Sequence, residues 1–208
     1  GDLTIENKSE RNELALGLTA SLYQTDTLRT TTANWQSKAG KPFATQTFGK
    51  TRILSAWAED KLHATDALTF GLGLRFDDWR AFDGGLGRHR YAARHETAVN
   101  PTASVQYAFA DGTLAQISLA MATRFPTVGE LFQGSLNGDG TFNVNSFDPN
   151  LKPERSKDAN LLVSHDFGAF KLTGSAFYQR VRNTLFQFIG FNQNNVSTSN
   201  YKNIELTR

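Results

Sequence analysis

The chain has 208 residues, of which 20% are charged and 39% are hydrophobic, and it contains no Cys. The absence of Cys excludes thiol catalysis, disulfide bonds and Cys-based metal sites. The 22 Lys and Arg residues almost balance the 20 Asp and Glu residues without long blocks of one sign, so the sequence does not indicate a nucleic-acid partner. No run approaches the roughly 18 apolar residues of a transmembrane helix, whereas a membrane-spanning β-strand needs only about 9–11 residues of alternating polarity.

Alternation of apolar and polar residues is the dominant pattern, and it predicts an all-β chain. Eight strands are expected in chain order, over residues 13–23, 51–62, 68–77, 97–109, 113–124, 157–167, 170–181 and 198–207. The third strand is the clearest, because every second residue from Leu68 to Phe76 is apolar. In the second strand both faces carry apolar residues. No segment longer than a turn or two is predicted to be helical.

The connections between these strands alternate in length. Tight turns rich in Asp and Gly are expected at residues 63–66, 110–112 and 166–168, and long connections at residues 25–49, 83–96, 125–156 and 186–197. A transmembrane barrel has short turns at one end and long loops at the other. Aromatic residues also lie close to the tight turns, where an interfacial girdle would be placed: Tyr107, Phe109, Phe167 and Phe170.

We therefore predict antiparallel neighbouring strands of an up-and-down transmembrane β-barrel, with three tight turns at one end. One face of the strands is expected to meet membrane lipid, and its members are Leu68, Phe70, Leu72, Leu74, Val105, Tyr107, Ile117 and Leu119. Small residues such as Gly71 and Ser118 on the opposite face suit the wall of a wide lumen. A soluble β-sandwich is the structural alternative.

Three stretches of the chain contain distinctive motifs. The first lies within residues 56–79 and consists of Asp60, Thr65, Asp66, Leu72, Gly73, Leu74, Arg75 and Asp77. The second lies within residues 121–132 and consists of Arg124, Pro126, Thr127, Glu130, Leu131 and Phe132. The third is DPNLKPERS, with Pro149, Asn150, Leu151, Lys152, Pro153 and Glu154. Together these motifs resemble those of the TonB-dependent outer-membrane receptors, with Asp148 in place of the family's leading Asn.

The resemblance implies that these eight or so strands belong to a barrel of 22 strands. Residues 1–208 are then expected to be part of the barrel domain, without the plug domain, its TonB-contacting box or the C-terminal strands. It also implies uptake of a ferric siderophore or similar scarce ligand across the outer membrane of a Gram-negative bacterium. The implied partners are this ligand, outer-membrane lipid, and the TonB complex acting through the missing plug. A non-transporting outer-membrane barrel is the functional alternative.

Ligand recognition is expected at the loops of residues 84–96 and 127–147. The first loop gathers guanidinium, phenol and imidazole groups, which suit an anionic ferric chelate through charge-assisted hydrogen bonds and cation–π contacts. The expected ligand contacts are Arg88, Arg90, Tyr91, Phe132, Asn143 and Asn145. Haem is disfavoured because residues 127–147 contain no His, although His89 and His95 keep it as an alternative.

Other chemistry finds little support in the sequence. Residues 137–148 place oxygen-bearing side chains at calcium-loop spacing, but Phe142 replaces the required Gly, so an exposed polar loop is favoured. Prolines of the second and third motifs are interpreted mainly as residues that fix backbone turns. Ser, His and Asp show no catalytic spacing. We therefore predict no enzyme activity, no resident metal and no cofactor.

Overall fold

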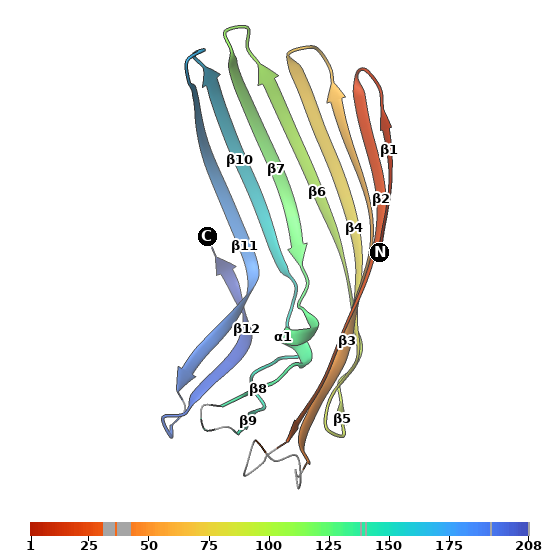
Figure 1. Ribbon diagram of the computed structural model, residues 1–208, viewed down its shortest axis with the longest axis vertical. Coiled ribbons are helices and arrows are strands. Elements are labelled where there is room, and N and C mark those ends of the chain that lie inside the picture. Colours follow the sequence, from red (N-terminus) through yellow and green to blue (C-terminus); the bar gives the residue numbers. More distant parts are fainter. Residues whose placement is uncertain (31–35, 37–42, 138, 140, 192, 208) are drawn as a thin grey trace.

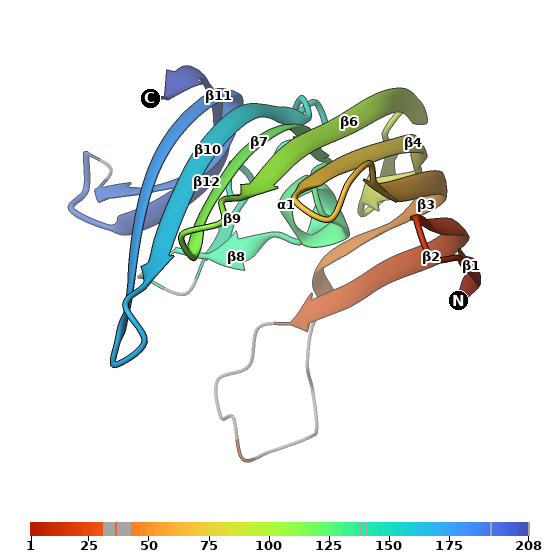
Figure 2. The same cartoon turned by 90° about the horizontal axis from the view of Figure 1, so that it is seen from above.

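A computed structural model describes residues 1–30, 36, 43–137, 139, 141–191 and 193–207. Its main element is one curved antiparallel sheet in the order β1-β2-β3-β4-β6-β7-β10-β11-β12, with β5 (His89–Arg90) paired to β4 (Figures 1 and 2). The strands are β1 (Asp2–Lys8), β2 (Asn12–Thr30), β3 (Phe43–His63), β4 (Leu68–Leu86), β6 (Arg94–Ala108), β7 (Thr113–Arg124), β10 (Glu154–Asp166), β11 (Lys171–Phe191) and β12 (Ser197–Thr207).

The predicted fold class is confirmed, since every expected strand is present and each pairs with its sequence neighbours in an antiparallel ladder. The expected number of strands is too low. β1 was missed because its short alternation offers only Leu3 and Ile5 as apolar residues on one face. The tight-turn end accordingly carries one more short connection than expected, between β1 and β2, beside those of β3–β4, β6–β7 and β10–β11 (Figure 1, top).

Three of the four expected long connections are shorter than predicted, because the strands continue past their apolar parts, whereas the connection between β7 and β10 has almost its predicted bounds. β2 reaches Thr30 and β3 begins at Phe43, so about half of residues 25–49 lies in the β2–β3 ladder. β4 likewise continues to Leu86 and β11 to Phe191. Backbone pairing requires no apolar face, so a polar stretch such as Gln24–Thr30 extends a strand without an alternation signal.

The convex face of the sheet carries the predicted apolar set. Leu72 is 62% exposed, Ile117 55% and Leu119 53%, and these side chains point away from the interior of the curve. Near the tight turns, Tyr107 packs edge to face against Phe109, with ring centroids 4.7 Å apart. In the described part of the chain no second sheet covers this face, as a sandwich would require.

The concave face holds the segment between β7 and β10, which contains α1 (Val128–Phe132), β8 (Ser135–Leu136) and β9 (Phe142–Asn143) (Figure 2). Most of the buried apolar side chains gather where this segment meets the sheet: Trp79, Ala81, Ala98, Phe125, Leu131, Phe132 and Leu151. The ambiguous second predicted strand is resolved here, because Ile53 packs against this cluster. The core thus lies inside the curve, at the end opposite the tight turns.

Candidate functional site

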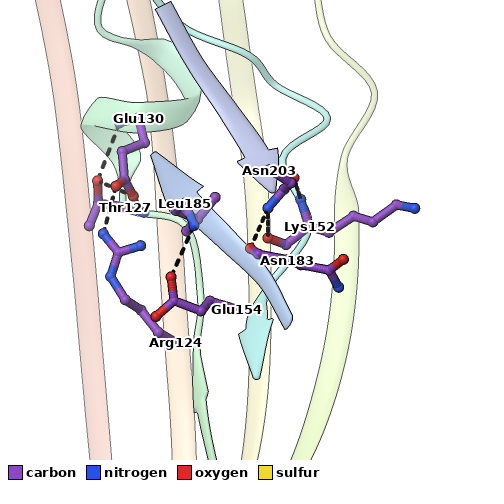
Figure 3. A network of polar contacts seen from close by, with 8 residues as sticks. All are labelled: Arg124, Thr127, Glu130, Lys152, Glu154, Asn183, Leu185 and Asn203. Carbon is purple, nitrogen blue, oxygen red and sulfur yellow. Dashed lines mark hydrogen bonds and ion pairs between the residues drawn. The ribbon is translucent and has the colours of Figure 1, made fainter. Parts of the chain in front are cut away.

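The second motif ends β7 and starts α1 through one carboxylate. Arg124 Nη2 lies 2.6 Å from Glu130 Oε1, and the Thr127 backbone N–H donates to Glu130 Oε2 at 2.8 Å (Figure 3). The Glu130 N–H donates in return to Thr127 Oγ1 at 3.2 Å, completing a capping box. Glu130 is only 8% exposed, so its charge depends on these donors. The Glu130 carboxylate thus fixes the turn between β7 and α1, which directs the following segment onto the concave face of the sheet.

Phe132 anchors this segment against two glycines of the sheet. The ring is 3% exposed and lies directly over Gly49 in β3 and Gly84 in β4. A Cβ atom at either glycine would lie 2.2 Å from a ring atom, closer than any real contact. Beside it, Phe125 stacks on Trp79 with ring centroids 5.5 Å apart. The absence of side chains at these glycines is what admits the ring.

The third motif is held by donors from strands far away in sequence. Arg94 Nη1 in β6 donates to the carbonyls of Pro149 and Leu151, both at 2.8 Å. Asn203 in β12 accepts from the Lys152 N–H at 2.8 Å and donates to its carbonyl at 2.9 Å (Figure 3).

The last residue of the third motif is also bound to the sheet. Glu154 Oε2 accepts the Leu185 N–H at 2.9 Å, as Figure 3 shows. The motif therefore ties β10 to β6, β11 and β12 at once. These contacts agree with the interpretation that both proline-containing motifs are mainly structural.

The first predicted ligand loop places its cations at the end opposite the tight turns. Arg88 is exposed, and Arg90 donates to the Gly87 carbonyl at 2.9 Å while its guanidinium lies 4.4 Å from the centre of the Phe48 ring. Tyr91 is half buried, and this burial raises the pKa of its phenol. The exposed cations and the partly covered phenol thus lie close together in the chain, with Arg90 packed on Phe48 and Tyr91 packed on Phe132.

Tyr91 belongs to an aromatic cluster at the edge of the core. Its ring stacks on Phe132 and meets Phe147 edge to face, each with centroids 6.2 Å apart, and His89 packs against it at 5.0 Å. The structure thus brings together Tyr91 and Phe132, two of the predicted ligand contacts. Only Tyr91 reaches the surface, because Phe132 lies beneath it.

The outer members of the predicted loop are separated from this cluster by the strand pattern. Arg94 and His95 lie in β6 and point to opposite faces of the sheet. His95 lies on the convex face, where its Nε2 is 2.6 Å from Asp78 Oδ2. Of the two histidines considered for haem, His89 alone stands at the aromatic cluster.

The second predicted loop uses most of its polar groups for its own turns. Asn143 is 5% exposed, donates to the Ser199 carbonyl at 2.8 Å and accepts the Asn145 N–H at 3.0 Å. Ser146 Oγ accepts the Ser135 N–H at 2.6 Å and closes the base of the loop. Asn145 itself is exposed. Asn143 therefore serves the loop's position, while Asn145 remains accessible.

The polar side chains of residues 137–148, which have calcium-loop spacing in the sequence, likewise form hydrogen bonds within the loop. Asp139 accepts from the Thr141 N–H at 2.9 Å and from its hydroxyl at 2.6 Å, and these donors lower the pKa of the Asp139 carboxyl. Gly138 and Gly140 of this stretch lie outside the described residues. Across the described ranges, there is no group of three or more His, Cys, Asp or Glu side chains placed to hold a metal ion.

Beneath the core, the concave face carries a polar network centred on Asp77. This carboxylate is 4% exposed and accepts from Ser55 Oγ at 2.6 Å, Arg75 Nε at 2.8 Å and Asn100 Nδ2 at 2.7 Å. The network faces an open hollow of about 620 Å³ that Arg124 also borders. The first motif therefore contributes a polar wall to the interior of the curve.

Sequence reasoning missed several residues that build the site. Phe48, Trp79 and Phe147 supply the rings beneath the loops, and Asn203 supplies the clamp on the third motif. Each lies in a different stretch from the motif it supports, so neither alternation nor spacing signals the contact. The concentration of aromatics next to Gly pairs is the one local hint, since Phe48 precedes Gly49 and Phe82 lies close to Gly84.

Solved structures with the same fold include a copper transporter, a ferric-catecholate import receptor and a siderophore receptor. The copper transporter OprC matches with a TM-score of 0.75 at 15% identity, over 98% of this chain and 33% of that one. The ferric-catecholate import receptor Fiu from K12 E. coli gives 0.64 at 13% identity, over 99% and 32%. The siderophore receptor PirA from Acinetobacter baumannii gives 0.61 at 17% identity, over 99% and 32%.

At these identities the similarity shows a shared fold, and the chain spans about a third of the length of these structures. A comparison with curated proteins gave no match. In the parts of the chain that the structure describes, no helix has the length and apolar character to cross a membrane.

The curved antiparallel sheet, with an apolar convex face and an infolded loop, defines a segment of an outer-membrane β-barrel. The model of the family "TonB dependent receptor-like, beta-barrel" matches residues 2–208. The chain therefore belongs to the TonB-dependent receptor family, as the three motifs predicted. This family comprises receptors and transporters of the Gram-negative outer membrane and not enzymes. The β-sandwich alternative is wrong.

Proposed function

We propose that the complete receptor carrying this chain captures an anionic ferric chelate of the siderophore type at its loop end and transports it inward. The observation that carries the proposal is that two exposed cations, Arg88 and Arg90, and the half-buried Tyr91 lie within four consecutive residues of one loop. Guanidinium groups bind carboxylate or catecholate oxygens by charge-assisted hydrogen bonds, and a neighbouring ring adds apolar contact. A chelate already saturates its iron, so the site needs charge and ring faces and no metal ligands.

The proposal assigns different roles to the six predicted contacts. Arg88, Arg90, Tyr91 and Asn145 are accessible and would touch the ligand. Phe132 and Asn143 are buried and would act by holding the loops in place. The Fiu and PirA structures, named for a ferric-catecholate receptor and a siderophore receptor, support the ligand class by their shared fold.

Transport in this proposal uses parts outside the present sheet. Residues 1–208 form one portion of the barrel, and a plug region of the complete receptor would lie against the concave face. Arg75 and Asn100 around Asp77 offer that region hydrogen-bonding groups. The TonB complex would then act through the plug from the tight-turn end, which is the inner side of the membrane in such barrels.

The proposal is tested by binding of a ferric tris-catecholate to the complete receptor in detergent. The triple variant Arg88→Ala, Arg90→Ala, Tyr91→Ala should bind at least about tenfold more weakly, because each desolvated charge-assisted contact contributes about 1.5–3 kcal/mol. A control with Arg11→Ala and Lys171→Ala loses the same charge near the tight-turn end and should bind as the parent does. Unchanged affinity in the triple variant would assign this loop to solvated surface.

A further inference from the structure

Four cations form a compact group on the convex face of β10 and β11. Lys157 lies directly opposite Arg180. Arg155 lies directly opposite Arg182, in the next pair on the same face, farther from the tight turns. Among the described residues, no carboxylate lies within ion-pair distance of any of the four. The neighbouring Asp158 points to the concave face, where it accepts from Ser156 and Gln179. Like charges directly opposite each other destabilise a strand pair, so an anion bound at this group would stabilise the pairing of β10 with β11.

The group stands where the apolar band of the barrel ends. On β11 the outward residues from the tight turn are Leu172, Gly174, Ala176 and Tyr178, and the next two are Arg180 and Arg182. On β10 the outward residues Val163, Leu161 and Ala159 lead to Lys157 in the same way. In a barrel of this family the apolar stretch faces hydrocarbon, so the cations lie at the level of lipid headgroups on the long-loop side.

An apolar groove begins directly beneath these cations. It lies between β6 and β10, and its outward lining includes Pro101, Leu119, Met121, Lys157 and Tyr178. The β6–β7 ladder ends at the pair Thr102–Ala120, next to Pro101, which has no backbone N–H to donate. The loss of pairing at this point leaves an open apolar groove that Lys157 also lines.

We propose that this surface binds a phosphorylated membrane lipid, with headgroup phosphates on the four cations and an acyl chain in the groove. Phosphate oxygens accept charge-assisted hydrogen bonds from both guanidinium and ammonium groups, and their negative charge relieves the repulsion between the paired cations. This inference is independent of the proposed ligand at the loops, because the two surfaces share no residue: Arg88 and Arg90 lie just beyond the end of β4, whereas the four cations lie on β10 and β11.

A second basic group on the convex face offers a comparison that favours β10 and β11 as the site for the lipid phosphates. Arg52, Arg80 and His95 also lie side by side across β3, β4 and β6. Asp78 stands among them and lies within 3.9 Å of Arg52, 3.4 Å of Arg80 and 2.6 Å of His95. That group carries its own counterion, whereas the β10–β11 group does not.

The test uses the complete receptor, delipidated in detergent and titrated with lipid A that carries two phosphates, with bound lipid counted by native mass spectrometry. The double variant Lys157→Gln, Arg180→Gln should bind lipid A at least about tenfold more weakly. Met121→Trp, which fills the groove, should also weaken binding. The charge-conserving variant Lys157→Arg, Arg180→Lys should bind as the parent does, which separates loss of charge from loss of folding.

The matched control is Lys8→Gln, Lys61→Gln, which removes two cations from the concave face near the tight turns. It should leave lipid A binding unchanged. Dephosphorylated lipid A should bind the parent and the Lys157→Gln, Arg180→Gln variant equally. Equal affinity of that variant and the parent for lipid A would overturn the proposal, as would an equal loss in the control, since the attraction would then follow overall charge alone.

Discussion

Gly84 illustrates how a single missing side chain determines the position of a whole loop. The Phe132 ring occupies the space where its Cβ would stand, and the same ring covers Gly49 on the adjacent strand. A buried aromatic ring contributes strongly to packing, so the two glycines convert part of a flat sheet into a socket. The chain between β7 and β10 is held on the concave face for this reason as much as through its hydrogen bonds.

We expect Gly84→Ala to expel the Phe132 ring and to destabilise the infolded loop by about 1–3 kcal/mol, the usual cost of overpacking. The matched control is Gly174→Ala in β11, where nothing lies within 4 Å of the added Cβ atom. Hydrogen exchange of the Leu131 and Phe132 amides in the complete receptor measures the effect. If both alanine variants exchange at the parental rate, the socket does not hold the loop.

Tyr91 gives the loop a dependence on alkaline pH. Burial raises the pKa of its phenol above the unfolded value of about 10. The unfolded chain therefore releases this proton at a lower pH than the folded chain does. The stability that the protonated Tyr91 phenol gives the folded loop is fully present below about pH 10, and it is lost as the pH rises through the folded pKa. Tyr91→Phe should remove this alkaline loss of loop stability, measured by amide exchange of Phe147 across that range. Tyr23→Phe, at a residue 54% exposed, should keep it.

The site was predictable from the sequence where chemistry and position are local. The cations Arg88 and Arg90 could be placed on an exposed loop, because charge and Gly content are read directly. The burial of Phe132 and Asn143 could not be predicted, because their partners, Gly49, Gly84 and Ser199, lie many residues away. Non-local packing of this kind leaves no periodic trace in either partner.

At the level of the strands, alternation fixed the faces correctly wherever one face is apolar. Leu72 lies on the convex face and its neighbour Gly73 on the concave face, as predicted. Alternation failed at the strand ends, because the polar residues of β2 beyond Tyr23 pair with β3 without facing lipid. The period-2 signal thus reports the membrane-embedded length of a strand and not its full hydrogen-bonded length.

We expect Leu72→Arg in the complete receptor to lower the free energy of unfolding in a bilayer by about 2–4 kcal/mol, because the guanidinium meets hydrocarbon near mid-strand. Thr102→Arg is the control, since Thr102 is exposed and faces the concave side beside Gly73. That variant should cost far less. Denaturant unfolding in vesicles measures both, and a larger loss for Thr102→Arg than for Leu72→Arg would reverse the assignment of the two faces.

For the molecule as a whole, the sheet has two free edges. β1 and β12 stand at opposite ends of the strand order, and each pairs with a neighbour on one side only. Unpaired backbone groups cannot remain in hydrocarbon, which contains no water to satisfy them. Further strands of the complete receptor are therefore expected to close the barrel against these edges.

We expect residues 1–208 expressed alone to fail to insert stably into lipid vesicles and to associate through the β1 and β12 edges. The complete receptor should insert under the same conditions and show the heat-modifiable migration of a folded barrel on gel electrophoresis. Sedimentation of the isolated chain measures its association. A monomeric, protease-resistant insertion of residues 1–208 would contradict this expectation.

The closed base of the loop between β7 and β10 separates the residues that hold the loop in place from the residues at its tip, which tolerate substitution. Ser135 and Ser146 are joined by a hydrogen bond of 2.6 Å, so the residues between them begin and end at the same point. Lengthening such a closed excursion costs little chain entropy, because the cost grows only with the logarithm of its length. The tip between β8 and β9 is therefore the part open to exchange, because Asn143 and the Ser135–Ser146 hydrogen bond keep the base in place. Exchanging this tip should alter ligand preference without moving the base.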